Sequence, residues 1–278
     1  MTLRRLRSFL LLLAFACVAS THPASASSVV LSDGEFAAAD WTTAVVSFGD
    51  GGTPTVDQVL TGGNPGSFRR IDLAIRAAPS PTTFSALWLF NIYNAAGYDP
   101  ATQGAILSID YGEDSIYLGG QNDLGVPLGT SNGAHAVSIA LVQNGILYTS
   151  TAYLANSESW TSRAFTGLGA GDFFRADGAA GSPDFSSTGA PMQLGFLDRV
   201  SGSVGGIGFD TATGIDNWSV TIHSVPEPST AILLGLSLAG LFTLSRRGQR
   251  RERSLRREVR FGDFYRGLGY FVPDADDT

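Results

Sequence analysis

The chain of 278 residues has room for one domain of ordinary size together with terminal segments. It contains a single cysteine and no lysine, so a disulfide scaffold, a paired-cysteine metal site and lysine-based chemistry are all excluded. Residues 28–224 carry roughly 12 more acidic than basic residues, which opposes binding to nucleic acid.

The N-terminal segment has the three parts of a secretory signal peptide. Three arginines form a basic start, and an apolar run follows at residues 8–19. The small residues Ala24 and Ala26 then occupy the positions that signal peptidase requires. The sequence therefore predicts a signal peptide over residues 1–26, removed before Ser27.

Residues 27–224 alternate short apolar runs with Gly-rich turns, which is typical of β-structure. The run Ser85–Tyr93 is apolar on both faces and favours a central strand, and Asn144-Gly145 predicts a hairpin turn. Other runs alternate apolar and polar residues with the period of two of a strand that has one buried face, at residues 71–75, 137–141 and 218–222. About ten strands and no amphipathic helix predict an all-β, two-sheet sandwich, a jelly roll. A concanavalin-like sandwich is the alternative.

The stretch Ser108–Gly120 brings three carboxylates together in the sequence, those of Asp110, Glu113 and Asp114. They are candidates for a cation loop or for the acid/base pair of a glycosidase, although such a pair usually comes from separate strands. A solvated hairpin tip is the favoured interpretation. His135 starts an alternating strand, which predicts a surface or edge position, so the sequence predicts no catalytic residue.

Aromatic side chains near turns are candidates for sugar contacts, because an exposed ring can stack on the apolar face of a pyranose. Trp88 and Trp218 lie inside strand patterns and are predicted to be core residues. The candidates for ligand binding lie near turns or strand edges: Trp41, Tyr98, Tyr153 and Trp160. The alternative for each of them is a place in the core.

Two segments of this body resemble a known family. "LSDGEFAAADWT" at residues 31–42 resembles the opening strand, and "GIDNWSVTI" at residues 214–222 the closing strand, of galactose-binding-like carbohydrate-binding modules. The resemblance implies that the first and last strands pair and that a structural Ca²⁺ lies where they meet. It implies Asp33, Glu35 and Asp216 as ligands, whose carboxylates suit a hard cation. Alternatively, the aspartates only shape turns.

The C-terminal segment combines a Pro-Glu-Pro, a short apolar run and an arginine cluster. The prolines keep their neighbourhood extended. Residues 231–244 form a run shorter than the ~20 residues of a comfortable membrane span, and the arginines after it favour the cytoplasmic side. These parts resemble the PEP-CTERM sorting signal of Gram-negative bacteria. The residues that carry the resemblance are Val225, Pro226, Glu227, Pro228, Arg246 and Arg247.

The resemblance implies an exosortase as partner, a membrane transpeptidase that cuts near the Pro-Glu-Pro. It divides the chain into an ectodomain at residues 27–224, a sorting signal with a short transmembrane helix at 225–251, and a polar cytoplasmic tail at 252–278. The predicted protein is anchored in the inner membrane and then released to the cell surface or the exopolysaccharide matrix.

The predicted function is that of a non-enzymatic surface or matrix protein, with binding of exopolysaccharide or another glycan as the candidate activity. A purely structural matrix protein without a ligand is one alternative. A polysaccharide-active enzyme is the other. Apart from the Ca²⁺ that the resemblance implies, no cofactor is expected.

Overall fold

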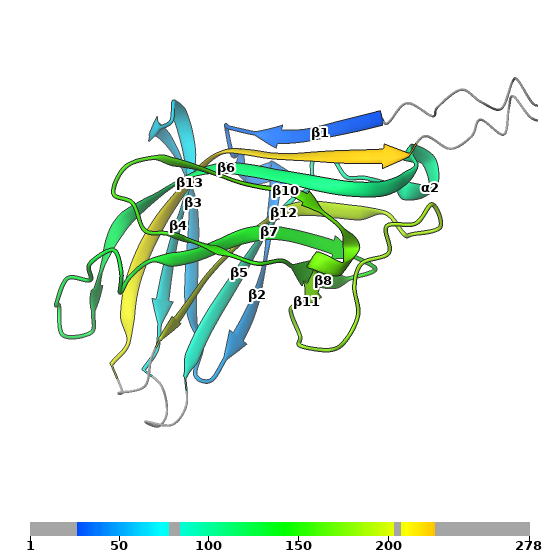
Figure 1. Cartoon of the computed structure of the whole chain (residues 1–278). Coiled ribbons are helices and arrows are strands. Elements are labelled where there is room, and N and C mark those ends of the chain that lie inside the picture. Colours follow the sequence, from blue (N-terminus) through cyan, green and yellow to red (C-terminus); the bar gives the residue numbers. More distant parts are fainter. Residues whose placement is uncertain (1–26, 78–83, 203–206, 226–278) are drawn as a thin grey trace, which may run out of the picture. The chain divides into compact units, whose positions relative to one another are not determined.

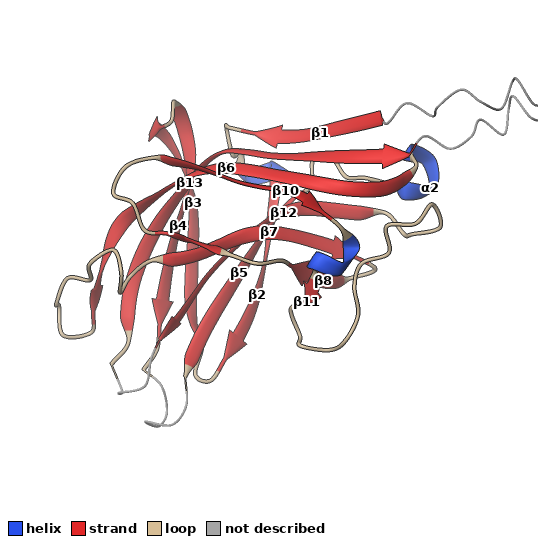
Figure 2. Ribbon diagram, in the orientation of Figure 1, coloured by secondary structure: helices blue, strands red, loops and turns tan. Residues whose placement is uncertain are grey.

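The computed structural model describes residues 27–77, 84–202 and 207–225, and strands dominate this part of the chain (Figures 1 and 2). The predicted signal peptide, most of the sorting signal and the polar tail lie outside the described residues. Within the described ranges, no helix has the length and apolar character needed to cross a membrane.

One antiparallel sheet, here called sheet A, has the strand order β10-β6-β13-β4-β3, and β1 also pairs with β13. Its strands are β1 (Ser27–Asp33), β3 (Gly52–Gly63), β4 (Gly66–Ile75), β6 (Ala105–Asn122), β10 (Thr161–Leu168) and β13 (Phe209–Val225).

The second antiparallel sheet, sheet B, has the order β11-β8-β7-β12-β5-β2, and β9 also pairs with β7. Its strands are β2 (Trp41–Phe48), β5 (Ser85–Tyr93), β7 (His135–Gln143), β8 (Ile146–Thr149), β9 (Tyr153–Ala155), β11 (Phe174–Arg175) and β12 (Met192–Gly202). The helical elements are the short turns η1 (Ala38–Asp40), α2 (Pro100–Gln103) and η2 (Ala170–Asp172).

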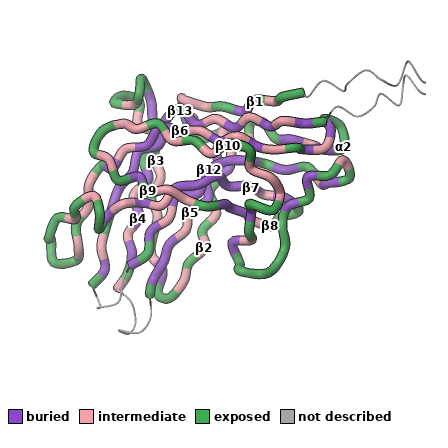
Figure 3. Tube along the Cα trace, in the orientation of Figure 1, coloured by how far each residue is buried: buried purple, intermediate pink, exposed green. Residues whose placement is uncertain are grey.

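The core lies between the inner faces of the two sheets. Alternating residues of β4, β7 and β13 are buried there, with the period that the sequence predicts, and Trp218 is fully buried. Buried segments occur along the strands of both sheets (Figure 3). The predicted all-β, two-sheet sandwich is therefore confirmed.

Strand β5 is buried on both faces, as its sequence predicts. Leu87 and Leu89 enter the main core, whereas Phe90 and Ile92 pack with Leu197 of β12 in a second cluster on the outer face of sheet B. Trp88 belongs to this outer face and not to the core predicted for it. It is partly exposed, and the guanidinium of Arg199 lies 4.7 Å from the centre of its ring.

Strand β13 joins three partner strands. Strand β6 pairs along almost its whole length on one side, while β4 and then β1 pair on the other side. The first and last strands therefore pair as expected, with Ser27 opposite Ser224. Residues 31–42 do not form one opening strand, however. They contain the end of β1, the turn η1 and the first residues of β2, which belongs to the other sheet.

The predicted hairpin turn at Asn144-Gly145 connects β7 to β8. Both residues have positive φ, 53° and 73°, as this type of turn requires.

Candidate functional site

The three carboxylates of β6 do not converge on one site. Asp110 accepts a hydrogen bond from the backbone N–H of Gly167 (2.7 Å), and its carboxylate lies 2.9 Å from Nε2 of His223. The hydrogen bond with His223, followed by that from Gly167, lowers the pKa of Asp110. Glu113 instead points into the core. Asp114 accepts hydrogen bonds from the side-chain amides of two asparagines elsewhere.

Glu113 is buried between the sheets, with an exposed fraction of 3%. The hydroxyls of Tyr111 and Tyr153 both donate to its carboxyl group. Burial raises its pKa to about 8, although these two hydrogen bonds oppose the shift, and the negative charge of Asp198 adds to it. At neutral pH the group is therefore mostly a neutral acid inside the sandwich.

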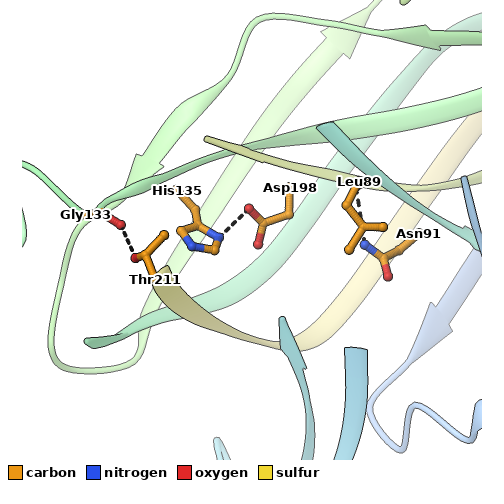
Figure 4. A network of polar contacts seen from close by, with 6 residues as sticks. All are labelled: Leu89, Asn91, Gly133, His135, Asp198 and Thr211. Carbon is orange, nitrogen blue, oxygen red and sulfur yellow. Dashed lines mark hydrogen bonds and ion pairs between the residues drawn. The ribbon is translucent and has the colours of Figure 1, made fainter. Parts of the chain in front are cut away.

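His135 is also in the core, so its predicted surface or edge position is wrong. Nδ1 of His135 lies 2.6 Å from Oδ1 of Asp198, and both side chains are fully buried (Figure 4). The cause is the register, which pairs β7 with β12 in the middle of sheet B and turns these two side chains to the inner face. The pair is therefore part of the core and not of a surface site.

A second polar cluster lies where the turn after β1 meets β13. Asp216 accepts hydrogen bonds from the backbone N–H groups of Asn64 and Asn217. Burial raises the pKa of Asp216, and the neighbouring charges of Asp114 and Glu35 raise it further. Two of the three predicted calcium ligands, Glu35 and Asp216, therefore lie in the same neighbourhood.

Asp33, the third predicted ligand, shapes the turn after β1. One carboxylate oxygen accepts from the backbone N–H groups of Glu35 (2.8 Å) and Phe36 (3.0 Å), and the other accepts from the indole N–H of Trp41 (2.6 Å). Among the described residues, no three or more His, Cys, Asp or Glu side chains form a group that could hold a metal ion. Calcium binding stays a prediction.

Two of the predicted sugar-contacting rings are buried, so neither has the exposed face expected for stacking on a sugar. Trp41 is 5% and Tyr98 is 1% exposed. Trp41 is the first residue of β2 and faces inward, where its ring meets that of Trp218 at 5.0 Å. The hydroxyl of Tyr98 donates to the carbonyl oxygens of Gln103 and Gly104.

The other two rings differ from each other. The hydroxyl of Tyr153 donates a hydrogen bond to the carboxyl group of the buried Glu113. Trp160 is partly exposed, donates its indole N–H to the carbonyl of Gly62 (3.0 Å) and packs edge-on against Phe68. A sugar contact at Trp160 stays a prediction.

Two hollows among the described residues were not predicted from the sequence. The larger one, of about 470 Å³, is lined at the end of sheet B by side-chain amides of Asn94, Gln103, Asn144 and Gln193. The other, of about 330 Å³, lies over sheet A and is lined by charged residues that include Arg70, Asp72 and Asp210. Their polar residues come from distant parts of the sequence. Asn144 was predicted as a turn residue, and Tyr98, a predicted sugar contact, also contributes to the lining of the larger hollow.

The ectodomain leads directly into the sorting segment. Strand β13 ends at Val225, which pairs with Ala105 of β6. Residues 224–247 match the family model described as the PEP-CTERM protein-sorting motif, so the predicted sorting signal is confirmed. The match includes Pro226, Glu227 and Pro228 together with Arg246 and Arg247. The motif implies export, anchoring in a membrane before processing, and processing by an exosortase.

Comparison with solved structures finds matches of low sequence identity. A carbohydrate-binding module that recognises mannan, TmCBM27, is 10% identical; the alignment covers 70% of this chain and 98% of the module, with a TM-score of 0.34. TmCBM61, solved with β-1,4-galactotriose, is 8% identical, with 65% and 86% coverage and a TM-score of 0.24.

A structure of infectious bursal disease virus, Gx strain, is 14% identical, with 73% and 33% coverage and a TM-score of 0.26. No curated protein matches the chain.

Proposed function

We propose that this chain is an exported protein that an exosortase processes, and that residues 27–225 act at the cell surface or in the exopolysaccharide matrix as a non-enzymatic, glycan-binding domain. The observation that carries the proposal is the match of residues 224–247 to the sorting motif. This match begins at Ser224, the second-last residue of the last strand, so almost the whole sandwich precedes the sorting segment.

The placement of the carboxyl groups of β6 and of the pair of His135 and Asp198 supports a binding role over a catalytic one. A glycosidase needs two carboxyl groups on either side of one bond, roughly 5–10 Å apart and open to substrate. The carboxylate of Asp110 is on the outer surface, whereas Glu113 is enclosed in the core with the pair of His135 and Asp198. None of these arrangements opens a pair of carboxyl groups to a polysaccharide.

Glycan binding is supported by the composition of the surface. The body is acidic, which disfavours polyanions such as nucleic acid. The lining of the larger hollow includes four neutral amides, which can donate to and accept from hydroxyl groups.

Two measurements on the mature protein recovered from its host test the two parts separately. Mass spectrometry of the termini should give Ser27 at the N-terminus and a C-terminus close to Glu227. An intact Thr278 would contradict processing by an exosortase.

Retention on the envelope polysaccharide of the same host tests the binding role. We expect the mature protein to be retained and to elute with excess free polysaccharide. Absence of retention on every envelope polysaccharide would refute glycan binding, while the sorting proposal would be unaffected.

A further inference from the structure

We infer that the hollow at the end of sheet B, here called the amide cleft, binds a neutral, hydroxyl-rich sugar chain. This inference rests on the glycan-binding role proposed above and assigns it to one site. The lining of the cleft is more apolar than polar, and its polar part includes the amides of Asn94, Gln103, Asn144 and Gln193. Its volume of about 470 Å³ lies within the usual range of small-ligand sites, roughly 300–1,000 Å³.

The strand pairing of sheet B fixes the positions of these amides. Gln193 of β12 is directly opposite Val142 of β7, and Asn144 is in the turn that follows β7. The loop before α2 is held to β12 by two reciprocal backbone hydrogen bonds between Tyr98 and Met192, of 2.9 and 2.8 Å. A ligand therefore meets groups that are already ordered, which reduces the entropy lost on binding.

The hydrogen bonds within the cleft leave both donors and acceptors for a ligand. Oδ1 of Asn94 accepts from the hydroxyl of Thr42 (3.2 Å) and the amide of Gln193 (3.4 Å), so Nδ2 of Asn94 and Oε1 of Gln193 remain available. Oε1 of Gln103 accepts from the backbone N–H of Asp99 (2.7 Å), which leaves its Nε2 as a donor. Within the described residues, the exposed side chain of Asn144 has no hydrogen-bond partner.

The charge of the cleft favours a neutral ligand. Asp99 is the charged residue of the lining, and its carboxylate oxygens accept from the N–H of Ala101 (3.0 Å) and the hydroxyl of Thr102 (3.1 Å) at the start of α2. Among the residues that the structure describes, the lining contains no arginine or histidine that would offset an acidic sugar. A hydroxyl group both donates and accepts, and it therefore matches the mixture of amide N–H and C=O groups.

The remaining lining suits sugar rings better than an extended peptide. Ala96, Val142 and Pro191 provide small apolar patches for ring C–H groups. A peptide that added a strand would need a free strand edge. Strands β5, β7 and β12, however, are paired on both sides.

The test is a calorimetric titration of the mature protein with short neutral gluco-, manno- and galacto-oligosaccharides. An oligogalacturonate and an extended neutral peptide serve as competing ligand classes. Two variants remove cleft amides while preserving the backbone: Asn144→Gly tolerates the positive φ of the turn, and Gln193→Met keeps the length of the side chain. The matched control is Gln121→Met, which makes the same change at an exposed strand position of β6 in sheet A.

We expect at least one neutral oligosaccharide to bind the wild type. Each cleft variant should weaken that binding roughly five- to tenfold, as the loss of about one hydrogen bond predicts, and Gln121→Met should not change it. Equal binding by the wild type and both cleft variants would overturn the site while leaving glycan binding intact. A loss of binding in Gln121→Met alone would also overturn the site, because it would place the bound sugar over sheet A.

Binding of the oligogalacturonate or the peptide in preference to every neutral sugar would overturn the assigned ligand class. If the mature protein is retained on envelope polysaccharide but binds none of the neutral oligosaccharides, the inference fails and the proposed function stands. Absence of both kinds of binding overturns both.

Discussion

Replacing the buried Glu113 by glutamine should remove a pH dependence of folding that the wild type carries. Its pKa is about 8 in the folded protein and near 4.5 when the group is exposed to water. Between pH 4.5 and pH 8, Glu113 therefore keeps its proton in the folded protein but has released it in the unfolded chain. The contribution of Glu113 to stability is therefore fully present below pH 4.5 and is lost as the pH rises toward and through 8.

The magnitude follows from about 1.4 kcal/mol for each pH unit over which one proton is held by the folded state alone. Between pH 5 and pH 7 the unfolded chain has largely released the proton and the folded protein has largely kept it. The free energy of unfolding of the wild type should consequently fall by about 2–3 kcal/mol from this group, and by about 1 kcal/mol more at pH 8. Glu113→Gln has no proton to lose and should lack this decrease.

The assay is urea unfolding of residues 27–225 followed by tryptophan fluorescence at pH 5, 6, 7 and 8. The measured quantity is the stability of Glu113→Gln minus that of the wild type, which cancels the titration of all other groups. It should increase by about 2–3 kcal/mol from pH 5 to pH 7. The control is Glu158→Gln, an exposed glutamate, for which the difference should stay constant. A constant difference for Glu113→Gln as well would show that Glu113 is already ionised in the folded protein at pH 5, and would refute its buried, proton-holding position.

Three further substitutions test the interior by the same unfolding assay. Asp33→Ala removes the acceptor of three hydrogen bonds at the turn after β1 and should cost about 2–4 kcal/mol, whereas an effect as small as that of the exposed Asp50→Ala would contradict its role in the turn. Trp41→Ala should cost about 3–5 kcal/mol because it empties a ring site in the core; a loss below 1 kcal/mol would mean that the ring is exposed after all. His135→Ala leaves the carboxylate of Asp198 buried without its partner and should cost about 3–5 kcal/mol, which an unchanged urea midpoint would disprove.

Local patterns predicted much of the sandwich. The period of two in β4, β7 and β13 is a local property of the chain, and so is the positive-φ turn at Asn144-Gly145. The sorting signal was also recognisable, because its three parts follow one another within a short segment.

Properties that depend on distant residues were not predictable in the same way. Trp41 is close to a turn, but its inward direction depends on the pairing of β2 with β5, which aligns it with Tyr93. The burial of His135 depends on β12, which lies far along the sequence.

The amide cleft is the extreme case. Its four amides are spread from residue 94 to residue 193, and the placement of β12 between β7 and β5 brings them together. Glu113, in contrast, shares the inward period of Ile109 and Tyr111, so its burial was visible in the sequence. Its polar neighbours in the sequence, however, favoured the prediction of a hairpin tip exposed to solvent.

The position of β13 affects the order of events during export. This last strand is an inner member of sheet A, and β1, β4 and β6 all need it as a partner. When only the residues before Phe209 have been exported, β1, β4 and β6 each lack β13 as a partner strand. The core between the sheets is then still open. Closure of the sandwich must wait until the residues next to the Pro-Glu-Pro emerge, so completion of the domain and arrival of its sorting motif nearly coincide.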